Sequence, residues 1–376
     1  MLLTSIYART ITYQQFHTSA RRNALPVLGI ASKLILKGLA WLSGRSVRVW
    51  YRGLPKDKRI ILKEHIIRNR LRYLGIIAGL SVGSAIHVYT HIESTPISGR
   101  RRYMVITKKQ LDKIVNSAKT ARDLAAYEFV LPETSEETKR VVKISERLLA
   151  ANLDLPGIRS YNWSIKVVNK PYWNADVFPT GAIYITKRMI ATENDDNKLA
   201  CILGHEIAHV ILGHTAESLS QMQVTDLLGV IAAFFIWSIL PSDWSSFLAY
   251  YIYNKFVKYS IRLSHSRSTE EEADVVGLRI AAKACYDVRR AVFLWKERST
   301  CKGERSDRTF SSTHPTNARR AQNLQKLMPL AVDLRMRCSC CKLDTLSNFQ
   351  EDQLENNHVI VKKYKHIFDK RDLTAI

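Results

Sequence analysis

The residues best suited to chemistry in this 376-residue sequence are two histidines and a glutamate in one short stretch. His205 and His209 are four residues apart, so on a helix they lie one turn apart on one face and can hold a single metal ion. Glu206 follows the first histidine, where the general base stands in H-E-x-x-H centres that hydrolyse peptide bonds. Apolar neighbours such as Ile202 and Ile211 suit a buried helix. The stretch predicts a hydrolytic zinc centre if a third ligand exists elsewhere.

The next histidine is a poor third ligand. His214 follows His209 by five residues, whereas the extended histidine pattern requires six. We therefore interpret His214 as an ordinary residue at the end of the helix.

A better ligand lies in the acidic run at residues 270–272, although such a run is often only a solvated helix face. Glu270 has Asp274 four residues later, whereas Glu271 and Glu272 have valines at that distance. A two-histidine, one-glutamate zinc site uses such a pair, with one carboxylate on the metal and one holding a ligand imidazole. We predict Glu270 as the third ligand, Asp274 as the residue that orients a histidine, and no place on the metal for Glu271 or Glu272.

These motifs resemble those of the membrane-associated zinc peptidases that include CAAX prenyl endopeptidases and HtpX-like bacterial proteases. The resemblance covers residues 130–330 and is carried by His205-Glu-Ile-Ala-His209, Ser266-Arg267, residues 270–274, residues 174–185, and Ser312-Thr-His314-Pro315 with Arg320 after it. Residues 92–100 and 278–285 carry a narrower likeness, to the family's mitochondrial inner-membrane peptidase whose activity overlaps that of the m-AAA protease.

The resemblance implies an α+β, mainly helical fold: a zincin-like (gluzincin) domain with a small sheet, preceded by a transmembrane helix. It implies one Zn²⁺ per subunit on His205, His209 and Glu270, with Glu206 as the base. His314 is expected to stabilise the oxyanion, although a lone histidine is more often a helix-cap bystander. The strand before the zinc helix is expected at the sheet edge, where it would bind an extended substrate, unless it is a plain structural hairpin. Its residues are Gly181, Ala182, Ile183, Tyr184 and Ile185.

The amino-terminal leader is strongly basic. Residues 1–56 contain nine lysines and arginines and no acidic residue, within a chain whose formal net charge is +23. With its many hydroxyl side chains, this composition is typical of a mitochondrial transit peptide, which we assign to residues 1–45, followed by a basic matrix-side segment at 46–72. The alternative is a nucleic-acid-binding arm, but no zinc finger, RNP motif or aromatic-basic pattern follows, so no nucleic-acid partner is expected.

Residues 73–92 are predicted to cross the membrane. The stretch from Leu74 to Ile86 has no charge, and Gly75, Gly79 and Gly83 form a stripe that lets another helix approach and leaves room for a homo-oligomer. More basic residues precede the span than follow it, which favours a single-pass inner-membrane protein with its catalytic domain in the intermembrane space. Residues 93–129 are assigned as a linker.

Residues 130–335 are assigned as the peptidase domain, and residues 336–376 as a tail. Within the domain, residues 227–240 are apolar but short for a span, so they predict a buried helix or one embedded in the membrane interface. The clustered Cys338, Cys340 and Cys341 lack a partner pair at zinc-finger spacing and are expected to be free or disulfide-bonded, whereas Cys285 is expected in the core or a loop.

The function predicted from these patterns is zinc-dependent cleavage of membrane-anchored proteins at the surface of the bilayer. The resemblance implies a stress-activated role in inner-membrane quality control, with the dynamin-like fusion GTPase among the substrates. Two alternatives stay open: a non-catalytic membrane scaffold of the same fold, which would not need Glu206, and a basic nucleic-acid-binding protein, which would carry its charge in the folded domain.

Overall fold

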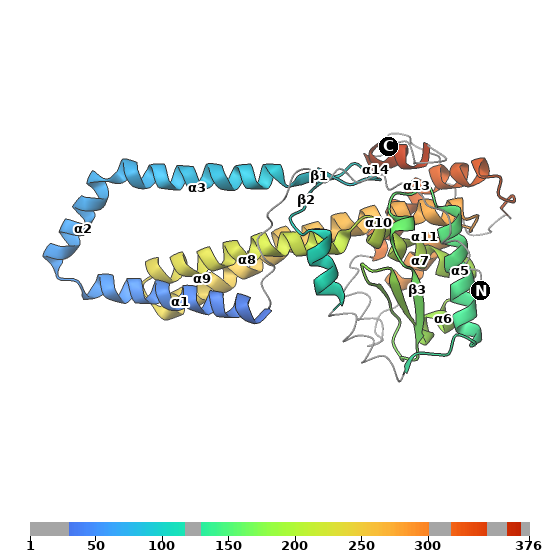
Figure 1. Ribbon diagram of the computed structural model, residues 1–376, viewed down its shortest axis with the longest axis horizontal. Helices are drawn as coiled ribbons and strands as arrows, with labels where there is room; N and C mark the ends of the chain where they lie inside the picture. Colours follow the sequence, from blue (N-terminus) through green and yellow to red (C-terminus); the bar gives the residue numbers. More distant parts are fainter. Residues whose placement is uncertain (1–29, 117–128, 301–316, 344–358, 370–376) are drawn as a thin grey trace.

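The computed structural model describes residues 30–116, 129–300, 317–343 and 359–369. Within these residues the protein is mainly helical, with a three-stranded and a two-stranded sheet. This confirms the predicted α+β, mainly helical class. A long helical extension projects from a compact body that contains the three-stranded sheet (Figure 1).

The extension is built from five helices. α1 (Ile30–Gly53) lies alongside α8 (His214–Ile239), which is followed by α9 (Asp243–Phe256). α2 (Lys56–Arg68) then turns the chain back, and α3 (Arg70–Thr90) returns to the body apart from the other helices (Figure 1). No residue of α3 is buried, as expected of a helix whose surroundings are lipid rather than protein.

Ion pairs fasten α1 to α8. The ammonium groups of Lys33 and Lys37 lie 2.8 and 2.9 Å from the two carboxylate oxygens of Asp226. Further along, the indole rings of Trp41 and Trp237 meet edge to face at 5.4 Å. The boundary predicted between residues 45 and 46 falls inside α1, which packs on α8, so the structure shows no break there and the end of the leader stays a prediction. The rest of the predicted leader, residues 1–29, lies outside the described residues.

A β-hairpin connects α3 to the body. β1 (Ile92–Ser94) and β2 (Arg101–Tyr103) pair antiparallel, and the turn between them holds Arg100. Arg100 and Arg102 both donate hydrogen bonds to groups of the body, at Glu217 and at the carbonyl of Leu212. The predicted linker at residues 93–129 thus begins as a hairpin anchored to the body, not as a free connection.

The three-stranded sheet corrects one prediction about substrate binding. β5 (Ala182–Thr186) lies in the centre, parallel to β3 (Ser164–Val168) and antiparallel to β4 (Ala175–Val177). The edge position predicted for residues 181–185 is wrong, because the backbone of β5 is paired on both sides. All five residues of β5 are buried, as expected of a strand that is paired on both sides. The outer strands are β3 and β4; residues 129–131 bond to the Val168 end of β3, whereas no described strand pairs with the outer side of β4.

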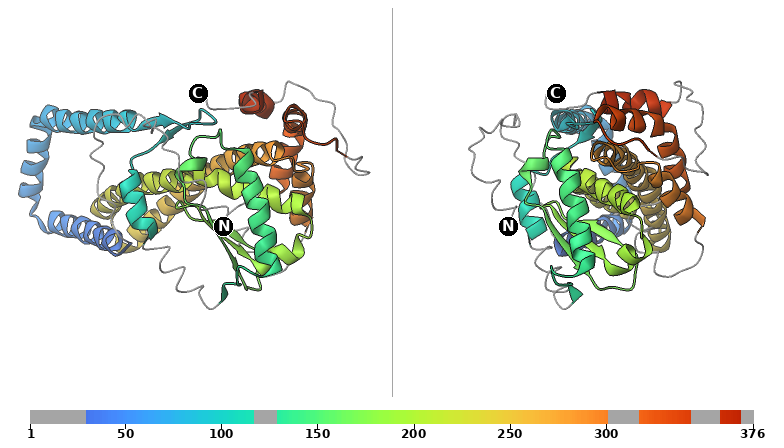
Figure 2. Two further views of the ribbon diagram at one scale, coloured as in Figure 1. Left: turned by 45° about the vertical axis from the view of Figure 1, so that its right-hand side comes forward. Right: turned by 90° about the vertical axis from the view of Figure 1, so that its right-hand side faces the viewer.

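The body packs helices on both sides of the central helix α7 (Asp196–Ile211). The sheet and α5 lie on one side, and α10, α11 and α13 lie on the other (Figure 2). Asp195 caps α7 by accepting a hydrogen bond from the Asn197 amide. The remaining elements are α5 (Glu136–Ala151), a 3₁₀ turn (Ile158–Ser160), α6 (Lys187–Thr192), a π-helix (Val257–Arg262), α10 (Leu263–Lys283), α11 (Arg290–Thr300), α13 (Asn317–Arg337) and α14 (Val359–Asp369).

Part of the segment predicted as a tail belongs to the core. α14 packs against α10 and α13, and its Tyr364, Ile367 and Phe368 are fully buried. The side chain of Arg279, on α10, donates to the Ile367 carbonyl. The assignment of residues 336–376 as an appended tail is therefore wrong for α14. The apolar side chains of α14 join those of α10 and α13 in one buried cluster.

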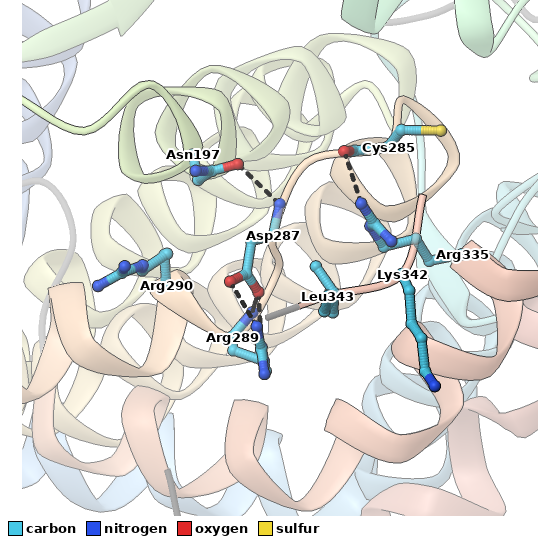
Figure 3. Close-up of a pocket in the computed structure, with 8 residues that line it drawn as sticks. All are labelled: Asn197, Cys285, Asp287, Arg289, Arg290, Arg335, Lys342 and Leu343. Carbon is cyan, nitrogen blue, oxygen red and sulfur yellow. Dashed lines mark hydrogen bonds and ion pairs between the residues drawn. The ribbon is translucent and has the colours of Figure 1, made fainter. Parts of the chain in front are cut away.

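A disulfide ties the start of this segment to the body. Cys285, which follows α10, is bonded to Cys340, while Cys338 and Cys341 are free. The Arg335 guanidinium donates to the Cys285 carbonyl at 3.2 Å, on the wall of a pocket beside the disulfide (Figure 3). The guanidinium of Arg289, which also lines the pocket, donates to both carboxylate oxygens of Asp287, at 2.8 and 2.9 Å. None of the residues that line this pocket belongs to the H-E-x-x-H stretch.

The disulfide should contribute measurably to stability. It joins residues 55 apart in sequence, and closing a loop of that length in the unfolded chain stabilises the native state by about 2–4 kcal/mol. We expect Cys340→Ser to lower the free energy of unfolding by that amount, measured by urea titration in detergent. Cys341→Ser, which alters an exposed free thiol, is the matched control and should change it little. Equal stabilities of the two variants would contradict the prediction.

Candidate metal centre

The centre is built where α7 and α10 cross at two glycines. A β-carbon on Gly204 would lie 2.9 Å from the Gly277 carbonyl oxygen, and one on Gly277 would lie 2.7 Å from the His205 amide nitrogen. Both separations are shorter than real side chains allow, so the two backbones are in direct contact. This contact places Asp274 and Glu270, one and two turns earlier on α10, beside the histidines of α7.

Three ligand atoms converge at this crossing. His205 Nε2 lies 3.1 Å from His209 Nε2 and 3.3 Å from a carboxylate oxygen of Glu270, whose other oxygen lies 3.4 Å from His209 Nε2. A tetrahedral ion with bonds of 2.0–2.1 Å holds its ligand atoms about 3.3 Å apart. The donor set and its spacing therefore fit a divalent metal ion such as zinc, and these residues form a metal-type cluster.

A carboxylate orients the first histidine. Asp274 Oδ1 lies 3.1 Å from His205 Nδ1, so this nitrogen carries the proton and Nε2 keeps its lone pair for the metal. Arg320 holds Asp274 in turn, donating to its two oxygens at 2.9 and 2.6 Å. Burial alone would raise the pKa of Asp274, but the charge of Arg320 and the contact with His205 lower it. Arg320 itself lies 3.6 Å from the ring centre of Trp295, which fixes its plane.

Glu206 is enclosed beside the ligands. Its side chain is 2% exposed, and burial raises the pKa of Glu206 to about 8, while the neighbouring carboxylates of Glu270 and Asp176 act in the same direction. A divalent cation next to it would favour the carboxylate form. Asp176 lies on β4, which packs against α7, so this outer strand of the sheet is close to Glu206.

The sequence analysis did not predict the contact between His214 and the ligand His209. His214 Nδ1 lies 2.8 Å from His209 Nδ1, and His214 Nε2 lies 3.2 Å from a carboxylate oxygen of Glu272. The interpretation of His214 as an ordinary helix-end residue is therefore wrong. Gly213 adopts a left-handed conformation (φ 70°) between α7 and α8, and this turn brings His214 back over the metal-binding face. A glycine directly before the histidine was the available signal.

Glu272 does not approach the metal ligands directly, in agreement with its helical phase, but it is fully buried. The hydrogen bond from His214 and the charge of Arg100 lower the pKa of Glu272 to about 2, against the effect of burial. Glu271 instead accepts hydrogen bonds from Lys363 and Tyr364 of α14. His314, predicted to stabilise the oxyanion, lies outside the described residues.

The crossing helices, the two histidines, the glutamate ligand and the enclosed Glu206 define a metallopeptidase of the H-E-x-x-H class. Comparison with known proteins agrees: residues 135–328 match Peptidase family M48. The mitochondrial metalloendopeptidase OMA1 of Homo sapiens is 32% identical, over 94% of this chain and 70% of its own length. The mitochondrial metalloendopeptidase OMA1 of Saccharomyces cerevisiae is 26% identical over 80% of this chain and 87% of its own. The metalloprotease YcaL of Escherichia coli is 25% identical over 61% and 84%.

The chain belongs to Peptidase family M48 and is a metalloendopeptidase. The family resemblance found in the sequence is thereby confirmed. Its relatives from vertebrates and yeasts are mitochondrial proteins, in agreement with the character of the amino-terminal leader.

The glycine crossing gives a direct test of how the centre is held. We expect Gly277→Ala to reduce the bound metal of the purified protein and to lower its free energy of unfolding by about 1–3 kcal/mol, because the new methyl group must push α7 and α10 apart. Gly229→Ala, on α8, is the control, since its β-carbon would meet Lys37 at an ordinary 3.6 Å. Elemental analysis of both variants decides; a wild-type metal content in Gly277→Ala would show that the crossing tolerates a side chain.

Proposed function

We propose that this metalloendopeptidase is a zinc enzyme of the mitochondrial inner membrane that cleaves membrane-anchored proteins. The catalytic part of this proposal rests on one observation. His205, His209 and Glu270 lie together on one side of α7, and the buried Glu206 lies beside them. Zinc is the ion that such a two-histidine, one-glutamate set binds in catalytic sites while leaving a position open.

The chemistry follows from where each group lies. A divalent cation held by the three ligands would supply Lewis-acid activation of water and of the scissile carbonyl. Glu206 would accept a proton from the attacking water and pass it to the leaving amine nitrogen. Asp274 and Arg320 keep the His205 imidazole in the tautomer that the site requires. This division of roles predicts separate consequences for losing the base and losing a ligand.

The unpaired side of β4 is the place we propose for the substrate backbone. β4 packs against α7, and its Asp176 acts electrostatically on Glu206, so a strand added there would pass close to the base. Strand addition supplies main-chain hydrogen bonds without requiring a particular substrate sequence. This replaces the binding strand predicted at residues 181–185 with its neighbour in the sheet.

Several features support a membrane location with the body outside the matrix. Two described helices, α3 and α8, are long and apolar enough to cross a membrane. The basic α2 lies at the end of α3 remote from the body, and basic segments favour the matrix side (Figure 1). The disulfide of the body suits an oxidising compartment. We therefore place the body in the intermembrane space.

The apolar part of α8 and the helix α9 carry a large exposed apolar surface. Its residues are more than 44% exposed: Leu227, Leu228, Ile231, Phe235, Ile239, Trp244, Phe247, Leu248, Tyr251, Ile252 and Phe256. Soluble proteins rarely expose a continuous apolar surface of this size to water, and contact with lipid would bury it. Of the two predictions for residues 227–240, this favours embedding in the membrane over burial in a core.

Membrane embedding of the α8–α9 hairpin would select substrates by proximity. The hairpin follows α7 through a single turn, so its depth in the bilayer sets the height of the metal centre. Anchored substrates would then meet the centre at a high effective concentration without additional contacts. The quality-control role and the cleavage of the dynamin-like fusion GTPase, both implied by the sequence resemblance, fit this selection, and we propose them for this chain.

Replacing the base should separate catalysis from metal binding. We expect Glu206→Gln to retain metal but to lower proteolysis to a few per cent of wild type or less, since the ligands survive and the proton acceptor is lost. Glu270→Gln should lose metal and activity together, whereas Glu271→Gln, whose side chain contacts α14, should lose neither. Metal content and peptidase assays on the three variants test this. Full turnover by Glu206→Gln would place the base elsewhere.

The apolar hairpin should matter for anchored substrates only. We expect the triple replacement of Leu228, Ile231 and Phe235 by serine to slow cleavage of a membrane-anchored substrate far more than that of a soluble peptide, because these exposed side chains face lipid. Trp237 is left intact because it packs on α1. Leu153→Ser, at an exposed leucine of the body, is the control. Equal slowing of both substrates would mean that the hairpin acts only in folding.

A further inference from the structure

The β-hairpin at residues 92–103, here called the juxtamembrane strap, joins the membrane to the metal centre. α3 ends at Thr90, so only His91 separates it from β1. The turn of the strap is tight: the Thr95 amide bonds to the Arg100 carbonyl at 2.9 Å, and Gly99 has a φ of 70°. This turn presents Arg100 to the interior of the body, where α8 and α10 meet.

Arg100 joins two buried carboxylates on different helices. It donates to both oxygens of Glu217, at 2.7 and 2.6 Å, and to Glu272 at 2.6 Å. The strap gives Glu272 two further donors, the hydroxyls of Thr95 and Ser98. Glu272 is 0% exposed, so water does not solvate its charge. Its hydrogen bonds come from the strap and from one histidine.

That histidine is His214, and it leads to a metal ligand. Glu272 accepts from His214 Nε2, which leaves the Nδ1 of a neutral His214 with a lone pair. His209 Nδ1, 2.8 Å away, must then be the donor in the contact between the two rings. His209 Nε2 consequently keeps its lone pair and faces His205 and Glu270. The opposite tautomer would place a proton where a metal should bind.

The two ligand histidines are therefore held differently. His205 has its own carboxylate, Asp274, in direct contact. His209 Nδ1 instead contacts His214, which contacts the carboxylate of Glu272, and Arg100 of the strap holds that carboxylate. Glu272 lies about 200° around α10 from Glu270, which is why the two glutamates serve the same centre from different sides.

We propose that the chain Arg100–Glu272–His214 positions His209 for metal binding, so that the juxtamembrane strap is a working part of the active site. Arg100, Glu272 and His214 are positioning residues that touch neither substrate nor metal. A displacement of α3 would act on the centre through this chain. The inference rests on the proposed function of the centre.

The test uses the full-length protein, stripped of metal and titrated with Zn²⁺ against a chromophoric chelator. Arg100→Gln and Glu272→Gln should each weaken the zinc affinity by about tenfold or more, as loss of an outer partner of a ligand histidine does elsewhere. Their neighbours Arg101→Gln and Glu271→Gln are matched controls and should keep the wild-type affinity. The Co²⁺-loaded Arg100→Gln and Glu272→Gln proteins should also show an altered visible spectrum, and their kcat should fall while KM for a soluble peptide is unchanged.

Ser98→Ala removes only one donor to Glu272 and keeps the test decisive if a charge variant does not fold. It should shift the zinc affinity in the same direction by a smaller factor. Wild-type zinc affinity and Co²⁺ spectrum in all folded variants would overturn the inference, even if their melting temperatures fall, because the chain would then be structural only. A wild-type protein that binds no zinc would instead contradict the proposed function itself.

Discussion

The backbone contact between α7 and α10 at Gly204 and Gly277 is the constraint on which the centre depends. Neither ligand helix could approach the other so closely with a side chain at either position. The contact sets both the distance and the rotation of the helices, and these decide whether Glu270 meets two histidines or lies in the core. The apolar residues on the other faces of both helices supply the burial that holds them together.

Burying so many charges at this crossing would be costly without partners, and the structure gives each of the main ones a partner. Arg320 serves Asp274, and Arg100 serves Glu217 and Glu272. Buried ion pairs of this kind add little net stability, but removing one member leaves an uncompensated charge. Their role here is to orient the histidines, because the fixed carboxylates set the tautomers of the imidazole rings. Polar groups that add little stability therefore determine whether the site can bind a metal.

The membrane helices and the centre are connected with almost no intervening chain. Leu212 and Gly213 separate α7 from α8, and His91 separates α3 from the strap that carries Arg100. α1 packs on α8, through the pairs of Lys33 and Lys37 with Asp226, and stiffens the same extension. The position of the extension in the bilayer and the geometry of the centre are therefore not independent. This connection is the physical basis of the restriction to anchored substrates that we propose.

The sequence by itself determined the features that lie within a few residues of each other. The spacing of His205 and His209 and the pairing of Glu270 with Asp274 follow from one turn of a helix. The candidate membrane span at α3 follows from its length and its apolar composition. Such local periodicities hold in almost any tertiary context, so the ligand set and the fold class were predictable.

Only the tertiary structure decided the contacts between distant segments. The central place of β5, the docking of α1 and α14, and the approach of Arg100 to Glu272 join parts of the chain that no local pattern relates. Strand order depends on which neighbour the chain returns to, and residues 181–185 would read the same at an edge or in the centre. His214 shows the same limit at short range, because one left-handed glycine turned a residue expected at a helix end back onto a metal ligand.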